Sequence, residues 1–197
     1  MQTNLLPFNI SLLIPTPEML HNIAPIQVLD IFEGATKNFH PLGLFSTEIF
    51  GKVGDERRSR AFSYIDLKVK VFHPVIFKAL CDLKQLYGEI MSGSSYALWD
   101  EEKKDFVKCS PAEGDTGFAY FVHYFPEIVF EERESTRREF NIKAVNKYRD
   151  NCMMDKLIVM PAGIRDYEVD DMGKPSEDEI NGFYRRAFSY SNLISPN

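Results

Sequence analysis

Seven basic residues stand in three groups that could bind phosphate: Arg57, Arg58 and Arg60; Arg165 and Lys174; and Arg185 and Arg186. Guanidinium groups suit this chemistry because their planar, paired donors match the geometry of phosphate oxygens. A short basic run is also typical of a solvated turn, and paired arginines fit the solvated face of a core-facing helix. Residue type therefore leaves a nucleic-acid-binding and a purely structural interpretation open.

The other residues that could carry chemistry do not form a recognisable site. Cys81, Cys109 and Cys152 lie far apart, and no Cys or His pair has the spacing of a zinc ligand set. Three distant cysteines indicate reduced thiols in a cytosolic protein rather than a disulfide framework. No nucleophile–base–acid set and no phosphate-binding loop is legible. We expect no metal ion and no catalytic residue in this chain.

The last two basic groups belong to residues 165–193, where an acidic loop containing Gly173 and Pro175 precedes a helix. Ser176 and Glu179 have the spacing of a capping box, which would satisfy backbone donors in the first helical turn. Five apolar residues then recur at helical spacing and predict one buried stripe: Ile180, Phe183, Tyr184, Ala187 and Phe188. The opposite face would carry Gly182, Arg185, Arg186 and Ser189.

The remaining segments predict an α+β fold with short antiparallel strands and several amphipathic helices. Extended or strand segments are expected over 4–14, 42–51, 64–72, 118–124 and 157–161, with a hairpin or excursion within 92–117. Helices are expected to begin at Thr16-Pro17 and at His73-Pro74, the latter running through Leu86 with His73 as a cap. A third helix is expected from Thr136, which with Glu139 suggests a capping box. In 64–72, one face would carry Ile65, Leu67, Val69 and Val71.

Composition bounds the class of protein. The chain has 197 residues, 44% of them hydrophobic, which is enough for one or two domains with a core. It has no apolar run of 18 residues and no basic segment before a hydrophobic stretch, so neither a membrane span nor a secretory signal is expected. A net charge of −6 argues against a free-standing DNA-binding domain but not against one chain of a larger assembly.

Residues 165–193 resemble the lid and the start of the clamp helices in the largest (β′) subunit of bacterial multisubunit RNA polymerases. That family has an arginine after a Pro-rich strand end, a lid loop, and a helix that starts D-L-N-x-L-Y-R-R. The matching residues here, in the same order, are Arg165, Gly173, Ile180, Asn181, Phe183, Tyr184, Arg185 and Arg186.

Further blocks of the chain resemble the same family in the same order. Residues 42–51 are similar to D-G-L-F-x-x-x-I-F-G-P, in which Phe45, Ile49 and Phe50 would be core residues. The run from Arg57 to Arg60 matches a basic run in the family, residues 64–80 match a strand and helix, and residues 159–165 match the strand before the lid. A weaker match covers 16–20, and the resemblance gives no help with 90–150.

Two family features are missing from this sequence. The four cysteines of the family's zinc ribbon do not follow residue 51, so the zinc ribbon is absent. The family's magnesium loop, N-A-D-F-D-G-D, is also absent; Asp170-Asp171 is the nearest imitation. The Mg²⁺ is therefore expected on a partner chain. Split, zinc-less subunits of this kind occur in some large bacteriophages.

The resemblance implies a single, irregular clamp-type module over 1–197, with a variable insertion-like region at 90–150, a lid-like loop at 163–175 and the start of the clamp helices at 176–194. It implies a non-catalytic part of a DNA-directed RNA polymerase that works with β- and β′-like subunits and holds the DNA template and the RNA–DNA hybrid. A promoter-specificity factor is a further implied partner. The implied location is the cytoplasm, that of the host for a phage protein, with packaging in the virion left open.

On this resemblance the nucleic-acid-binding residues would be Arg57, Arg58, Arg60, Arg165, Lys174, Arg185 and Arg186. Two rival interpretations remain. The chain could be a non-catalytic interaction protein that mimics the clamp and regulates a polymerase or sigma-like factor. It could also be an unrelated α+β structural protein. A stand-alone hydrolase is the least supported class.

Overall fold

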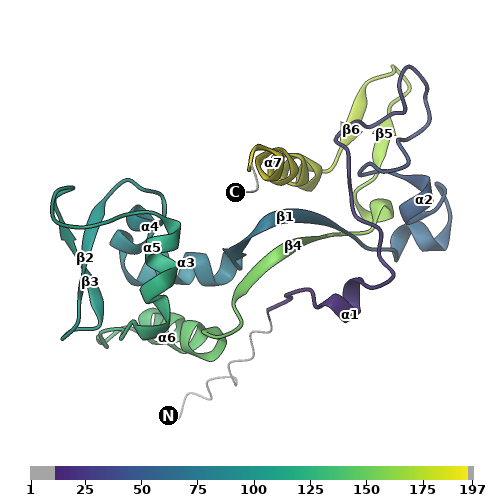
Figure 1. Cartoon of the computed structure of the whole chain (residues 1–197). Coiled ribbons are helices and arrows are strands. Elements are labelled where there is room, and N and C mark those ends of the chain that lie inside the picture. The colour runs from purple at the N-terminus through teal and green to yellow at the C-terminus, as the bar shows by residue number, and fades with distance from the viewer. Residues whose placement is uncertain (1–11, 195–197) are drawn as a thin grey trace, which may run out of the picture. The chain divides into compact units, whose positions relative to one another are not determined.

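A computed structural model describes residues 12–194, and the chain within it forms two compact units (Figure 1). Unit 1 comprises residues 72–153 together with Leu12 and Leu13; unit 2 comprises residues 14–71 and 154–194. The expected module over 1–197 is thus built from two units, each with its own core. The architecture is α+β, as predicted, with short antiparallel strands and a final helix. None of the described helices is long and apolar enough to cross a membrane.

Unit 2 holds most of the segments that resemble the polymerase family. Its elements are α1 Pro17–Leu20, α2 Thr47–Phe50, η1 Glu56–Ser59, β1 Ser63–Phe72, β4 Met153–Val159, η3 Ala162–Ile164, β5 Tyr167–Val169, β6 Pro175–Glu177 and α7 Glu179–Leu193. Strand β1 pairs with β4, and β5 pairs with β6. The chain passes from unit 2 to unit 1 at the end of β1 and returns at the start of β4.

The 42–51 segment is a capped helical turn, and the predicted strand there was wrong. Ser46 Oγ accepts hydrogen bonds from the amides of Glu48 and Ile49, which begins α2. Gly51, at φ 95°, ends the turn in a conformation that favours glycine. The core prediction is confirmed, because Phe45, Ile49 and Phe50 are buried in unit 2. Local capping chemistry overrode an aromatic pattern that also fits a strand.

Strand β1 is confirmed, but its two faces do not alternate along the whole length. Ile65 is fully buried and Leu67 is half-buried, whereas Val69 is exposed. The break falls at Lys68, whose φ is 63°, and Asp66 Oδ1 accepts the amide of Lys68 at 2.8 Å. A side-chain acceptor two residues before a positive φ forms a local turn within the strand. The alternation predicted through Val71 therefore stops at this residue.

Unit 1 contains α3 Pro74–Leu83, α4 Gln85–Met91, β2 Tyr96–Asp100, β3 Asp105–Cys109, α5 Phe118–Tyr124, η2 Phe125–Glu127 and α6 Thr136–Tyr148. The predicted cap is confirmed, since His73 Nδ1 accepts the amide of Val75. The sequence predicted one helix running through Leu86, but the backbone of Lys84 is extended and ends α3. A second helix, α4, follows, and Gly88 lies inside it. The predicted hairpin is confirmed as β2–β3, with Trp99 opposite Phe106.

The aromatic segment 118–124, predicted to be a strand, is helix α5. The rings at positions 118, 121 and 125 follow helical spacing, and all three contact Phe72. This packing forms part of the core of unit 1. The β-propensity of single aromatic residues does not take such packing into account, so it predicted a strand. Helix α6 is confirmed, but its capping residue is Ser135 and not the predicted Thr136. Of the extended segment predicted over 4–14, residues 4–11 lie outside the described part.

Candidate nucleic-acid interface

The lid-like segment folds into an ordered β-hairpin, β5–β6, in which Tyr167 is opposite Glu177 (Figure 1). Its turn is organised by Asp170, whose Oδ1 accepts the amides of Met172 at 3.0 Å and Lys174 at 2.7 Å. Gly173, at φ 79°, supplies the left-handed residue that the turn needs. Met172, at the tip, is 90% exposed. The hairpin thus presents an apolar side chain next to Lys174.

Helix α7 begins two residues later than the sequence indicated. The capping residue is Asp178, whose side chain accepts the amide of Ile180, and the predicted cap Ser176 was wrong. Ser176 instead lies in β6 opposite Glu168, so its backbone belongs to the ladder of the hairpin. Asp178 is an equally good capping residue.

The buried face of α7 is also rotated from the predicted stripe, and consists of Asn181, Tyr184, Phe188 and Ser191. Phe183, predicted to be buried, is 47% exposed. The face is rotated because Asn181 is completely buried, where it hydrogen-bonds both the side chain and the backbone of Arg165. A buried amide that is fully paired can occupy the core face in place of an aromatic ring.

Arg165 lies in the core of unit 2, where it is 2% exposed. Its guanidinium donates to the carbonyls of Met160 and Leu44, both at 2.9 Å, and to Asn181 Oδ1 at 2.8 Å. It also lies over three rings, those of Phe45, Phe50 and Tyr184, at 5.1–5.7 Å from their centroids. Burial lowers the pKa of Arg165 to about 10.

Arg58 is the second buried arginine, also 2% exposed. Its Nε and Nη2 donate to the two carboxylate oxygens of Asp166, each at 2.6 Å, in a paired geometry. Its Nη1 donates to the carbonyl of Gly51 at 2.8 Å, and the Phe45 carbonyl is 3.3 Å away. The two adjacent residues Arg165 and Asp166 therefore connect to α7 and to the 42–58 segment.

These contacts change the role of two predicted phosphate ligands. A phosphate cannot reach the guanidinium groups of Arg58 and Arg165 while they are buried and their donors are satisfied within unit 2. Burial of a cation is stabilising only with such complete pairing. We therefore assign both residues a structural role and remove them from the nucleic-acid-binding set.

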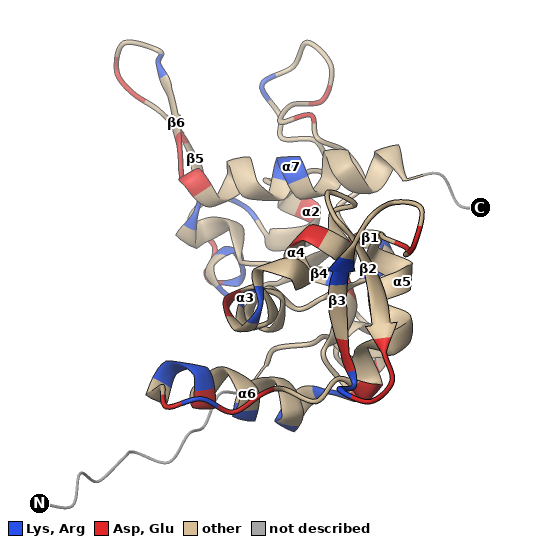
Figure 2. Ribbon diagram, turned by 90° about the vertical axis from the view of Figure 1, so that its left-hand side faces the viewer, with Lys and Arg blue, Asp and Glu red and all other residues tan. Residues whose placement is uncertain are grey.

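The other five predicted residues lie at or near the surface, with different degrees of pairing. Arg57 donates to the carbonyls of Glu48 and Ile49, and Arg60 forms an exposed ion pair with Glu56. Arg185 is held by both carboxylate oxygens of Glu177. Lys174 and Arg186 are exposed and have no side-chain partner within residues 12–194. These two cations are therefore the most available for phosphate. Figure 2 shows the charged residues along the hairpin and α7.

Helix α7 has an exposed face that the sequence analysis missed. Phe183, Tyr190 and Leu193 are 47%, 66% and 78% exposed, and Arg186 lies on the same face. The spacing 183–186–190–193 alternates steps of three and four residues, which is the a/d pattern of helices that pack side by side. We call these four residues the α7 seam. The pattern was present in the sequence but was hidden by the assignment of Phe183 to the core.

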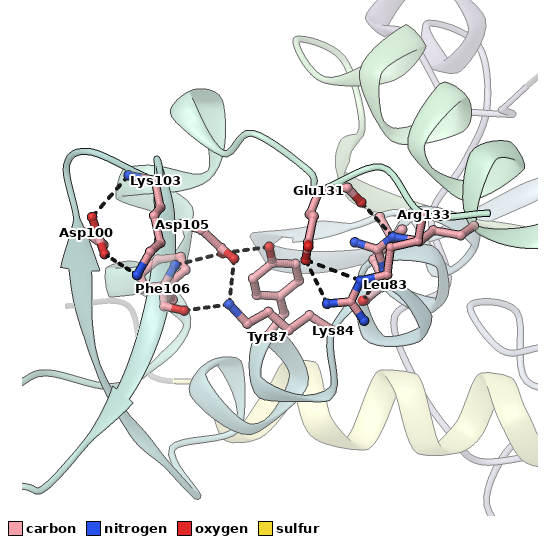
Figure 3. Close-up of polar contacts among 10 residues, drawn as sticks. Leu83, Lys84, Tyr87, Asp100, Lys103, Asp105, Phe106, Glu131 and Arg133 are labelled. Carbon is pink, nitrogen blue, oxygen red and sulfur yellow. Dashed lines mark hydrogen bonds and ion pairs between the residues drawn. The ribbon is translucent and has the colours of Figure 1, made fainter. Parts of the chain in front are cut away.

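Unit 1 has a polar cluster that could be mistaken for a catalytic group (Figure 3). Asp105 accepts from the Tyr87 hydroxyl at 2.7 Å and from Lys84 Nζ at 2.5 Å, and Lys84 also donates to the carbonyl of Phe106. Burial, followed by the hydrogen bond to Asp105, raises the pKa of Tyr87. A buried phenol that holds its proton this firmly is suited to fastening the β2–β3 hairpin onto α4 rather than to proton transfer.

Within the described residues there is no group of three or more His, Cys, Asp or Glu side chains that could hold a metal ion. In comparisons with known proteins, no protein family matches this chain, and no curated protein sequence shows significant similarity to it.

Proposed function

We propose that this chain is a non-catalytic part of a multisubunit DNA-directed RNA polymerase, contributing clamp and lid elements that hold DNA and the RNA–DNA hybrid. The proposal rests on the resemblance of its sequence blocks to the β′ subunit. Its main structural support is the way those blocks meet: Arg58 contacts segment 42–51 and Asp166, and Arg165 contacts Leu44 and Asn181. Three blocks separated in sequence, 42–51, 57–60 and 165–193, thus share one buried network in unit 2.

In this proposal the β5–β6 hairpin serves as the lid. Its ordered turn projects Met172, an apolar side chain that could rest against the terminal base pair of a hybrid, while Lys174 neutralises a nearby phosphate. Arg186, on α7, adds a second cation, and the same unit carries Arg57 on η1 and Arg60 directly after it. Because the chain supplies contacts and no metal ligands of the magnesium loop, nucleotide addition requires a partner chain.

The α7 seam supports an assembly rather than a free-standing protein. Three apolar side chains at a/d spacing are costly to leave in water, and a second helix from a partner subunit would cover them. Phosphate contacts made within such an assembly do not require the isolated chain to be basic, which agrees with its net charge of −6.

The proposal is tested by asking whether the chain assembles with polymerase subunits and whether the complex needs it for RNA synthesis. The tagged chain is expressed with the products of neighbouring reading frames, and the purified complex is assayed for DNA-dependent RNA synthesis with and without this chain. Stoichiometric recovery with β- and β′-like chains, and loss of synthesis when it is omitted, would support the proposal. Binding that inhibits synthesis, with full activity in its absence, would contradict it and favour a regulator that mimics the clamp.

A further inference from the structure

The β5–β6 hairpin needs packing beyond its own ladder to stay in place. Within residues 12–194 its two strands pair only with each other, over three residue pairs, and a lone two-stranded hairpin is at best marginally stable in water. Five of its six strand residues are exposed, and Tyr167 is the one that is half-buried. The contacts of Tyr167 are therefore the main apolar attachment of the hairpin to unit 2.

Three aromatic rings surround the ring of Tyr167. Phe45, from the buried core, lies 5.7 Å away between ring centroids. Phe32 and Phe39 lie at 5.5 and 6.3 Å, and both meet Tyr167 edge to face, at interplanar angles of 88° and 84°. Edge-to-face pairs stabilise a contact beyond the apolar area that they bury. The two phenylalanines belong to residues 31–40, a segment that the sequence analysis left unassigned.

The 31–40 loop presents these two rings together. Phe32 and Phe39 pair across it in an isolated antiparallel bridge, and two backbone hydrogen bonds of 2.9 Å flank this bridge. The two rings stack at 5.7 Å between centroids, with an interplanar angle of 8°. Figure 1 shows the loop between α1 and α2, beside β5 and β6. The loop therefore offers a single aromatic surface to Tyr167.

Phe32 and Phe39 differ in what else they touch. Phe39 packs against the core of unit 2, where it contacts the ring of Phe45 at 5.7 Å and lies under the Arg58 guanidinium at 5.4 Å. Within residues 12–194, the ring contacts of Phe32 are with Phe39 and Tyr167 alone. Removal of the Phe32 ring should therefore loosen the hairpin and leave the core of unit 2 intact.

Two ion pairs also restrain the hairpin at its base. Asp166, directly before β5, accepts from Arg58 through both carboxylate oxygens. Glu177, at the end of β6, accepts from Arg185 in the same way. These pairs hold the ends of the two strands, and the aromatic contacts add the apolar packing that a two-stranded hairpin requires.

We propose that Phe32 is a positioning residue for the β5–β6 hairpin. Held against Phe39, its ring fixes the ring of Tyr167 and thereby the direction in which the hairpin leaves unit 2. The tip residues Met172 and Lys174 then keep a constant position relative to the core. That these tip residues contact a hybrid rests on the proposed function, whereas the role of Phe32 in holding the hairpin does not.

The first arm of the test measures backbone order in the isolated, full-length chain by ¹⁵N NMR relaxation. In the wild type, residues 168–176 should have the order parameters of a rigid backbone, about 0.85. Phe32→Ala should lower them to below about 0.6, while those of α2 stay at their wild-type values. Phe32→Tyr, which keeps an aromatic ring at this position, should restore the order of the hairpin.

The matched control is Phe62→Ala, which removes another phenylalanine ring of unit 2 that is 48% exposed. It should leave the order parameters of residues 168–176 unchanged. Wild-type values in Phe32→Ala, or an equal fall in Phe32→Ala and Phe62→Ala, would overturn the proposal. A fall of the order parameters across the whole of unit 2 in Phe32→Ala would assign its ring to the core and overturn the proposal as well.

The second arm asks whether Phe32 acts through Lys174, with a fluorescein-labelled RNA–DNA hybrid and the assembled complex. Phe32→Ala and Lys174→Gln should each weaken binding about fivefold at about 0.15 M salt, the effect of one lost phosphate contact. The double variant should bind no more weakly than Lys174→Gln alone, because the two changes remove the same contact. Additive losses would overturn this link.

The two arms separate this inference from the proposed function. The first arm uses neither nucleic acid nor a polymerase partner, so it decides the role of Phe32 by itself. Absence of hybrid binding by the wild-type complex would contradict the proposed function, and the order of the hairpin in the isolated chain would remain the measure of what Phe32 does.

Discussion

Arg165 and Asn181 exchange two hydrogen bonds in the core of unit 2: Arg165 Nη1 donates to Asn181 Oδ1, and Asn181 Nδ2 donates to the carbonyl of Arg165, both at 2.8 Å. Both residues are buried, and no carboxylate within residues 12–194 accepts a hydrogen bond from the Arg165 guanidinium. Neutral acceptors and aromatic rings hold the cation. The position of α7 therefore depends on this exchange.

The first prediction concerns this pair. Asn181→Ala removes an acceptor of a buried guanidinium and a donor to a buried carbonyl, so it should lower the free energy of unfolding by about 2–4 kcal/mol. Chemical denaturation followed by circular dichroism measures the change. The control is Asn192→Ala on the same helix, where the exposed amide bonds only to Lys68 and the expected change is within about 0.5 kcal/mol. Equal effects of the two variants would show that the exchange does not stabilise α7.

The second prediction concerns pH and the cap of α3. Burial lowers the pKa of His73 below its ordinary value of 6.5, and its neutral Nδ1 accepts the amide of Val75. Because the folded-state pKa is lower than the unfolded one, the stability from neutral His73 is present above pH 6.5. It is lost as the pH falls through the folded-state pKa. Thermal unfolding between pH 7.5 and 5 should show this decline.

The matched variant for the His73 prediction is His73→Asn, which keeps a good capping side chain but does not titrate. It should be folded at pH 7.5 and show a flatter decline between pH 6.5 and 5. If the two proteins lose stability in parallel over this range, titration of His73 is not responsible for the acid sensitivity.

The third prediction tests the cations of unit 2. Lys174→Gln and Arg186→Gln should each weaken binding of nucleic acid to the assembled complex, and each should reduce the slope of log affinity against log salt by about 1. Lys37→Gln provides the comparison, because it removes another exposed cation from unit 2 that is outside the predicted set. Filter binding at several salt concentrations gives the slopes, and unchanged slopes for both variants would remove these residues from the interface.

The fourth prediction concerns the α7 seam. Tyr190→Ala with Leu193→Ala should abolish co-purification with the partner subunit and change the unfolding free energy of the isolated chain by less than about 1 kcal/mol, because both side chains are exposed. Val53→Ala, at another exposed apolar residue of unit 2, should leave co-purification intact. Full recovery of partners with the double variant would show that the seam is not an interface.

Local signals predicted much of the fold. The cap at His73, the β2–β3 hairpin and the helix over most of 176–194 follow from a few neighbouring residues each. The errors have two sources: packing between distant residues, and local side-chain hydrogen bonds such as those made by Ser46 and Asp66. Helix α5 forms because its rings pack on Phe72, more than forty residues earlier, and the break in β1 depends on one positive φ at Lys68.

The sequence also predicted only part of the candidate site correctly. The exposure of Lys174 and Arg186 agrees with a loop and a solvated helix face. The burial of Arg58 and Arg165 could not be predicted from a basic pattern, because it depends on acceptors far along the chain: Asp166 for Arg58, and Leu44 and Asn181 for Arg165. One signal was available, since Asn181 stands between residues of the apolar stripe and a polar residue there requires a partner.

The two hydrogen bonds between Arg165 and Asn181 also join the two ends of the segment 166–180, which contains the β5–β6 hairpin. Asp166 and Asp178, near the two ends of this segment, are held by Arg58 and by the start of α7, whereas the turn near Met172 is exposed. Residues inserted at the tip near Met172 should therefore be absorbed by the turn. One residue inserted between Glu179 and Asn181 would instead rotate the rest of α7 by about 100° and withdraw Tyr184 and Phe188 from the core. The tip of the β5–β6 hairpin can therefore vary in length and sequence while the core of unit 2 stays the same.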